Sequence, residues 1–153
     1  MSLPIEKPFA ELFQTAFEDG DREFANKISE QNNLHCLQKM FDVLLKGDLD
    51  SFGENLSPDA EMEIFCPSEF RFIKQAKGRD EIKNATAHNF SSLKDQQTNL
   101  LSVIAQGNTI ICVGEEKGKF EDTNRNYDVN FMQQFTISNY LVTHFRQIIA
   151  FSE

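Results

Sequence analysis

The chain has 153 residues, of which 40% are hydrophobic and 25% charged, and its formal net charge is -9. This length and composition indicate one globular domain rather than a disordered chain. The charge argues against nucleic acid and anionic membranes as partners, because binding to phosphates needs clustered Lys and Arg, and no basic run is present. The three cysteines lack CxxC or Cys/His spacing, so we expect reduced thiols, no metal site and no cofactor.

The N-terminal segment carries no apolar signal-peptide core, and no apolar run is long enough to span a bilayer. We therefore expect a cytoplasmic protein without a membrane partner. Apolar residues from Phe9 to Phe17 recur at helical spacing, which predicts an amphipathic helix ending near Gly20. A second helix is predicted after Asp21, with a break at residues 31–33.

The next segment changes from helical to strand periodicity. A helical pattern covers residues 33–46, and Asp48 can cap a short helix after it. Residues 60–66 then alternate with period two, which predicts a strand with Glu61 and Glu63 on one face. Paired carboxylates at this spacing could share a proton. An exposed polar face is the simpler interpretation.

The rest of the chain is one helix followed only by strands. The helix is predicted over residues 81–93, with Asp80 as its cap. Helices followed by long strands indicate an α+β fold in which helices pack on one face of a curved antiparallel sheet, leaving its concave face available for a ligand. The strand patterns cover residues 97–106, 109–120 and 127–151, with turn signals at Gly107-Asn108 and Ser138-Asn139.

Three motifs within residues 37–151 carry a family resemblance: LLKGDLDSFGENLSPDAEMEIF, KGRDEIKNATAHNF and HFRQIIAF. With these motifs the chain resembles the SnoaL-like branch of the nuclear-transport-factor-2-like superfamily, which includes ketosteroid isomerase. The resemblance implies a cone-shaped half-barrel with an internal pocket, commonly a homodimer through the outer face of the sheet. Members include isomerases, cyclases, dehydratases and hydrolases, as well as binding modules without known chemistry.

The chain departs from the family pattern in its last strand. When Phe145-Arg146 is aligned with the family's Ile-Arg, Gln147 stands where Glu is usual, and Ala150 stands where an acid often lies. A mechanism that depends on that carboxylate is therefore in doubt for this chain. The resemblance also divides the chain into an N-terminal helical extension, residues 1–28, and a SnoaL-like domain, residues 29–153.

The closing hairpin supplies the candidate site. If Ser138-Asn139 is a two-residue loop, Gln133 faces His144 and Phe131 faces Arg146. That face combines apolar walls with polar groups and could bind an apolar ligand, with His144 as a catalytic acid or base. The alternative is that this face is a dimer surface. The ligand-binding candidates on it are Tyr127, Phe131, Gln133, Phe135 and Arg146.

The opposite face of the hairpin presents a rival polar pair, Asp128 and Asn130. If that face is concave, Asp128 becomes the candidate base and Asn130 a ligand-binding residue. The alternative is a solvated Asp near the end of the loop. From these features we expect a protein that binds a small, mostly apolar molecule. The competing hypothesis is a cofactor-independent isomerase, cyclase or dehydratase that acts on a carbonyl compound.

Overall fold

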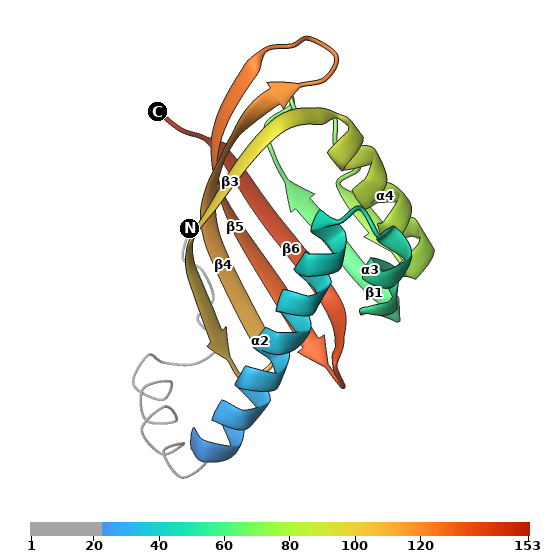
Figure 1. Cartoon of the computed structure of the whole chain (residues 1–153), viewed down its shortest axis with the longest axis vertical. Coiled ribbons are helices and arrows are strands. Elements are labelled where there is room, and N and C mark those ends of the chain that lie inside the picture. Colours follow the sequence, from blue (N-terminus) through green and yellow to red (C-terminus); the bar gives the residue numbers. More distant parts are fainter. Residues whose placement is uncertain (1–22) are drawn as a thin grey trace, which may run out of the picture.

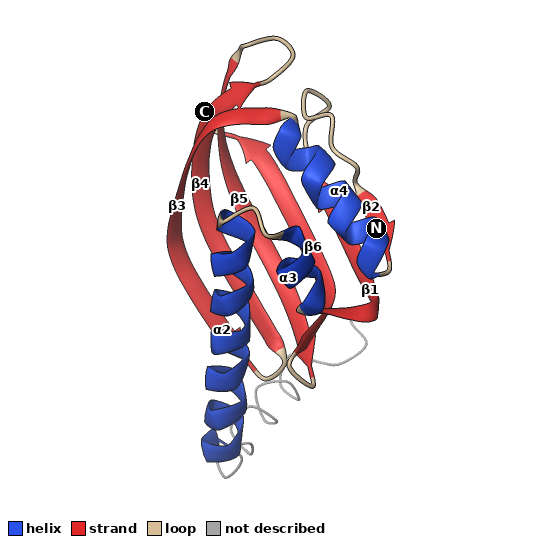
Figure 2. Ribbon diagram, turned by 45° about the vertical axis from the view of Figure 1, so that its right-hand side comes forward, coloured by secondary structure: helices blue, strands red, loops and turns tan. Residues whose placement is uncertain are grey.

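The computed structural model describes residues 23–153. The amphipathic helix expected over residues 9–17 lies outside this part of the chain. The described residues form an α+β fold in which helices cover one side of a curved, unclosed sheet (Figures 1 and 2). The expected fold class is thus confirmed. The elements are α2 (Glu23–Leu45), α3 (Leu49–Glu54), β1 (Leu56–Phe65), β2 (Gln75–Lys77), α4 (Arg79–Ser91), β3 (Leu93–Gln106), β4 (Thr109–Phe120), β5 (Asn126–Ser138) and β6 (Leu141–Phe151).

The six strands of the sheet lie in the order β2-β1-β6-β5-β4-β3. Strands β3 to β6 form an antiparallel meander, whereas β1 pairs with β6 in parallel. The expectation of an all-antiparallel sheet is therefore wrong. The first and last long strands meet only through tertiary pairing, which a local sequence pattern does not specify. Strand β2 was not predicted because its three residues are too few to show a period.

Helix α2 runs without interruption from Glu23 to Leu45, so the predicted break at residues 31–33 is wrong. Asn33 is buried in the middle of this helix and donates a hydrogen bond from Nδ2 to the Gly107 carbonyl, at 3.3 Å. Glu30 accepts a hydrogen bond from the Gly107 amide at 2.9 Å. These two contacts hold the helix against the β3–β4 turn, and tertiary packing thereby overrides the weak local helix propensity of the Asn pair.

The helix caps agree only partly with prediction. Asp48 caps α3 as expected, since its carboxylate accepts a hydrogen bond from the Ser51 amide. Helix α4, in contrast, begins at Arg79 after Gly78, so the expected cap Asp80 lies inside its first turn. An acidic residue in that position still interacts favourably with the positive end of the helix dipole. None of the helices in residues 23–153 combines the length and the apolar character needed to cross a membrane.

The hydrophobic core lies between the helices and the inner, concave face of the sheet. Along β1, Ala60, Met62 and Ile64 are buried while the intervening residues point outward, as the period-two pattern predicted. Near the centre of the core, the Phe135 ring contacts Phe41 of α2, with ring centroids 5.6 Å apart. At the end of the sheet near the C-terminus, the segment before β2 contributes Phe70, which packs on Phe72, Phe120, Tyr127 and Phe151.

The closing hairpin has a different register from the predicted one. Its two-residue turn is Asn139-Tyr140, both with positive φ, rather than Ser138-Asn139. A bulge at Thr143 then adds one residue to β6, so that Thr136 pairs with His144 and Phe135 pairs with Phe145. Because neighbouring residues on a strand point to opposite faces, the added residue exchanges the two faces of β6 relative to β5.

Candidate functional site

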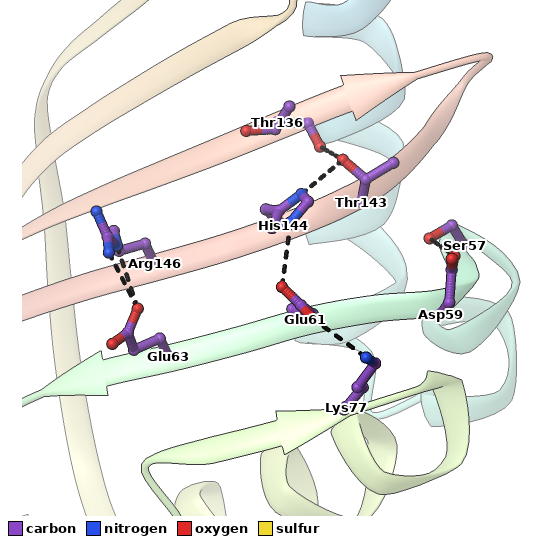
Figure 3. A network of polar contacts seen from close by, with 9 residues as sticks. All are labelled: Ser57, Asp59, Glu61, Glu63, Lys77, Thr136, Thr143, His144 and Arg146. Atoms are coloured by element: carbon purple, nitrogen blue, oxygen red, sulfur yellow. Dashed lines mark hydrogen bonds and ion pairs between the residues drawn. The ribbon is translucent and has the colours of Figure 1, made fainter.

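The parallel pairing of β1 and β6 brings charged residues together on the outer face of the sheet. Glu61 lies beside His144 and Glu63 beside Arg146 (Figure 3). On the other side of β1, Glu61 pairs with Lys77 of β2, whose Nζ lies 3.6 Å from a Glu61 carboxylate oxygen. Neighbouring strands in register therefore build a charged cluster from residues far apart in the sequence.

His144 lies between a carboxylate and a hydroxyl group. Its Nε2 is 3.2 Å from Glu61 Oε2, and its Nδ1 is 3.1 Å from Thr143 Oγ1 (Figure 3). Thr143 Oγ1 itself donates to the Thr136 carbonyl at 3.3 Å, which leaves the hydroxyl oxygen as an acceptor for the ring. A protonated imidazole satisfies both contacts at once. The arrangement can therefore pass a proton between the ring and Glu61.

Arg146 is the second cation of this cluster. Its Nε and Nη2 both donate to Glu63 Oε2, at 3.3 and 3.1 Å, and its guanidinium carbon lies 6.0 Å from the centroid of the Phe65 ring. The side chains of Arg146 and Glu63 are 56% and 37% exposed. At such exposure water weakens the attraction, so the pair orients the two side chains more than it stabilises the fold.

A hollow of about 480 Å³ lies over this cluster on the outer face. Its walls come from β2, β1, β6 and β5, and charged side chains occupy much of them. Its volume would admit a small molecule, but open polar walls are unlike the mostly apolar sites that bind apolar ligands. The polar and charged residues that line it are Glu61, Glu63, Gln75, Lys77, Gln134, Thr136, His144 and Arg146.

The inner face carries a different polar group, a pair of amides in an apolar wall. Gln133 of β5 and Gln147 of β6 are register partners, and both are partly buried. No hydrogen bond or ion pair joins either amide to another described residue, and both amides still reach water, since every buried side-chain nitrogen or oxygen in this part of the chain has a partner. Their neighbours along and across the strands are apolar or weakly polar: Ile64, Cys112, Phe131, Phe135, Phe145 and Ile149.

Tyr127 also lies on the inner face, but its hydroxyl is already bonded. It donates to Glu116 Oε2 at 2.7 Å, while Glu116 Oε1 accepts from Thr98 at 2.6 Å. Burial and the neighbouring carboxylate raise the pKa of Tyr127 well above its usual range. Its ring lies over Gly118, where a Cβ would meet the hydroxyl oxygen at 2.5 Å. Tyr127 therefore has a place in the core that is independent of any ligand.

The predicted site residues lie on two opposite faces of the sheet, so the predicted register of the β5–β6 hairpin, which placed His144 and Arg146 on one face with Gln133 and Phe131, is wrong. The bulge at Thr143 is the reason, since it turns the even-numbered residues of β6 outward beyond that position. Whether any of them binds a ligand stays a prediction. Tyr127, Phe131, Gln133 and Phe135 lie on the inner face, whereas Asp128, Asn130, His144 and Arg146 lie on the outer face.

The two candidate catalytic residues are also far apart. His144 pairs with Thr136, which is eight residues from Asp128 along β5. At about 3.4 Å per residue this separation is roughly 27 Å. The Asp128 carboxylate lies 3.9 Å from Lys117 Nζ, and Asn130 donates to Ser152 Oγ at 3.2 Å. In the structure, the acidic neighbour of His144 is thus Glu61. The sequence analysis considered Glu61 only together with Glu63, as two carboxylates that could share a proton.

Gln147 was missed as an inward-facing residue because its face was assigned from the assumed turn. The sequence contains a signal that could have found it: the odd-numbered positions of β6 include the bulky Phe145, Ile149 and Phe151, and the even-numbered positions include His144 and Arg146. The bulkier apolar set is the better candidate for the buried face. Within residues 23–153, no group of three or more His, Cys, Asp or Glu side chains could hold a metal ion.

Helices against the concave side of a curved, unclosed sheet form the α+β cone of NTF2-like proteins. The family model for the SnoaL-like domain matches residues 37–145, which is more than half of the chain. The chain therefore belongs to the SnoaL-like domain family. No curated protein matches the sequence significantly.

Solved structures of the same fold share little sequence with this chain. An NTF2-like protein from Burkholderia xenovorans LB400 is 22% identical, with a TM-score of 0.69, over 80% of this chain and 92% of that one. A protein described as a SnoaL-like polyketide cyclase, from Jannaschia sp. CCS1, is 15% identical, with a TM-score of 0.68, over 79% of this chain and 87% of that one. TerC, co-crystallized with polyporic acid, is 17% identical, with a TM-score of 0.62, over 79% and 92%. At these identities the likeness shows the fold alone.

Proposed function

We propose that this protein binds a small, mostly apolar molecule against the inner face of its sheet, with Gln133 and Gln147 as the hydrogen-bonding groups. The observation that carries the proposal is the opposed pair of amides without a partner among the described residues. Removing an amide from water is costly unless a hydrogen bond replaces the lost one. Because no buried side-chain nitrogen or oxygen among the described residues lacks a hydrogen bond, both amides still reach water, and a ligand that displaces this water has to bond both amides in its place.

The surroundings of the amide pair define the chemical class of the ligand. The register partners of the pair on β1 and β4 are Ile64 and Cys112, neither of which carries a charge. A charged ligand would therefore lose its hydration without gaining an ion pair. Each amide offers both a donor and an acceptor, so the favoured ligand has an apolar body with a carbonyl or hydroxyl group. The co-crystal of TerC with polyporic acid is consistent with small ligands for this fold.

Binding of a probe of this class tests the proposal. We suggest measuring the binding of 2-naphthol, a neutral molecule with an apolar body and one hydroxyl group, by titration calorimetry with the full chain and with the variants Gln133→Leu and Gln147→Leu. Each variant should weaken binding roughly fivefold, the effect of losing one hydrogen bond of about 1 kcal/mol. Gln134→Leu is the matched control, because its side chain lies on the outer face of the same strand. Equal affinity in all four proteins would refute the inner-face site.

A second candidate function is general acid–base catalysis on the outer face, and the geometry of His144 favours it. A histidine with a carboxylate at 3.2 Å and an adjoining hollow of about 480 Å³ could move a proton to or from a bound carbonyl compound. In that case His144→Gln should abolish turnover and Gln147→Leu should leave it unchanged. The reverse result would assign the chemistry to the inner face. The match to a family with cyclase members is the reason to test turnover at all.

We also propose that the protein forms a homodimer through the outer face. An apolar row crosses four strands there in register: Phe65 beside Ile148, Ile148 beside Met132, and Met132 beside Val113. Phe65, Ile148 and Met132 are each about half exposed. A contiguous exposed apolar row beside paired charges is typical of an interface. Light scattering should show a dimer that Met132→Glu dissociates, and a monomer in the unaltered chain would refute this assembly.

A further inference from the structure

Two cations that line the outer-face hollow keep hydrogen-bond donors that no other described residue uses. Arg146 is the first of them. Its Nε and one N–H of Nη2 donate to a single oxygen of Glu63, Oε2. A guanidinium carries five N–H groups, so three of them, including both on Nη1, make no hydrogen bond to another described residue. The unused groups belong to the end of a side chain that lines the hollow.

Lys77 is the second of these cations. Its Nζ lies 3.6 Å from Glu61 Oε1, which is longer than a hydrogen bond of about 2.7–3.2 Å, so the attraction is purely electrostatic. The Glu61 carboxylate, in contrast, has a basic group on each oxygen, because His144 contacts its Oε2 from the opposite side (Figure 3). A cationic ligand that approached Glu61 would meet these two basic groups first. The arrangement therefore favours an anion as the ligand.

The balance of charge in the hollow points the same way. The charged residues that line it are two carboxylates, Glu61 and Glu63, and three basic groups, Lys77, His144 and Arg146. When the imidazole is protonated, which satisfies both of its contacts, the hollow has one positive charge in excess. The whole chain has a formal net charge of -9. The hollow thus attracts a small anion on a protein that otherwise repels one.

We propose that the outer-face hollow binds a small carboxylate and that Arg146 holds it, because the free fork of Nη1 and Nη2 matches the two oxygens of a carboxylate. This inference rests on the second candidate function and narrows its carbonyl compound to an oxo acid. His144 and Arg146 are two positions apart on β6, about 7 Å along the strand, so one short molecule can place its carbonyl group at His144 and its carboxylate at Arg146. The hollow, about 480 Å³, has the size of a small-molecule site, about 300–1,000 Å³.

Levulinate, a five-carbon 4-oxo acid that is an anion at pH 7, is a suitable probe, and its methyl ester is the neutral control. In a titration of the full chain followed by NMR of the ligand, levulinate should bind about tenfold more tightly than the ester. Arg146→Gln should remove most of this difference, and Arg146→Lys, which keeps the charge but loses the fork, should remove less of it. Lys117→Gln should leave both affinities unchanged, because Lys117 pairs with Asp128 and does not line the hollow. Added NaCl should weaken the binding of levulinate more than that of the ester.

Equal affinity for levulinate and its ester would overturn the inference, as would an affinity for levulinate that Arg146→Gln leaves unchanged. A second measurement separates the inference from the acid–base function: exchange with D2O of the hydrogens on the carbons next to the ketone, followed by proton NMR. Binding that depends on Arg146 without exchange above the rate in buffer would support the carboxylate site and refute catalysis by His144. Exchange that requires His144, is unaffected by Arg146→Gln and is equally fast with the ester would support the catalysis and refute the carboxylate site.

Discussion

The inner and outer faces of the β5–β6 hairpin differ in what their side chains do. On the inner face, Phe135 is packed: it is 2% exposed and contacts aromatic rings on α2 and β6. The outer face is open, and its ion pairs are half exposed. The same strands therefore provide stability on one side and polar contacts on the other. The difference shows that a polar residue on this hairpin has a different role according to the face on which it lies.

The largest expected difference between the faces is in packing. Phe135→Ala should lower the free energy of unfolding by about 3–5 kcal/mol, because it leaves a cavity between Phe41 and Phe145. Met132→Ala, on the outer face of the same strand and 46% exposed, should cost about 0.5–1 kcal/mol. Urea unfolding measures both values. Equal costs would mean that the outer face is as tightly packed as the inner one, for example in a dimer.

A second effect tests how closely β4 and β5 approach on the inner side. A Cβ at Gly114 would meet Phe131 Cζ at 2.5 Å and the Asn99 carbonyl oxygen at 2.7 Å. Gly114→Ala should therefore destabilise the fold by about 1–3 kcal/mol. In a Phe131→Leu background the cost should be smaller, because the shorter side chain relieves one of the two contacts. Additive costs in the double variant would contradict this explanation.

Alkaline pH should lower the free energy of unfolding through two groups that are buried on the inner face. Burial raises the pKa of the Cys112 thiol to about 11, and burial together with Glu116 raises that of Tyr127. Both pKa values are higher in the folded protein than in the unfolded chain, where they are about 8.5–9 for Cys and about 10 for Tyr. The contribution of each neutral group to the free energy of unfolding is therefore complete below its unfolded pKa and is lost as pH rises through and above that value. Urea unfolding between about pH 8 and pH 11 measures this loss.

Variants separate the two groups in that titration. Cys112→Ala should reduce the loss of stability between about pH 9 and pH 11, and Tyr127→Phe should reduce the part above about pH 10. A profile that Cys112→Ala leaves unchanged would show that its thiol ionises freely in the folded state. Native Cys112 should also react with a thiol reagent much more slowly than an exposed cysteine, because its side chain is fully buried.

The smallest expected effect is on the outer face. Arg146→Ala should lower the free energy of unfolding of the monomer by at most about 1 kcal/mol, since its pair with Glu63 is exposed to water. It should leave the affinity for an inner-face ligand unchanged. Calorimetry with the 2-naphthol probe and light scattering together measure this outcome. A loss of affinity for that probe would indicate that the ligand lies on the outer face.

Local patterns were sufficient for most elements of the fold. The alternation over β1 predicted its buried residues, the Gly107-Asn108 signal placed the β3–β4 turn, and the resemblance indicated the family. Asn33 shows where local patterns fail. Its low helix propensity suggested a break, whereas its hydrogen bond to Gly107 holds it within α2. The sequence separation of 74 residues in that contact explains the failure.

The candidate site was predictable in composition and not in arrangement. The residue types of the closing hairpin indicated polar groups among apolar walls, and Gln133 was correctly grouped with the aromatic residues of β5. The outward position of His144 and Arg146 depends on one extra residue at Thr143, which a pairing derived from the turn alone does not include, although the bulky apolar residues at odd-numbered positions of β6 indicate its buried face. Their partners, Glu61 and Glu63, arrive through a parallel pairing between strands about eighty residues apart.

By itself the sequence determined the α+β class, the family and the strands from which a site could be built, because periodicity and turn chemistry act within a few residues. Only the tertiary structure decided which polar groups meet. Strand pairing is set by the packing of the whole core, and a single bulge changes which face of β6 is inside. That choice places the amides of Gln133 and Gln147 toward the helices and the charges of His144 and Arg146 on the outer face.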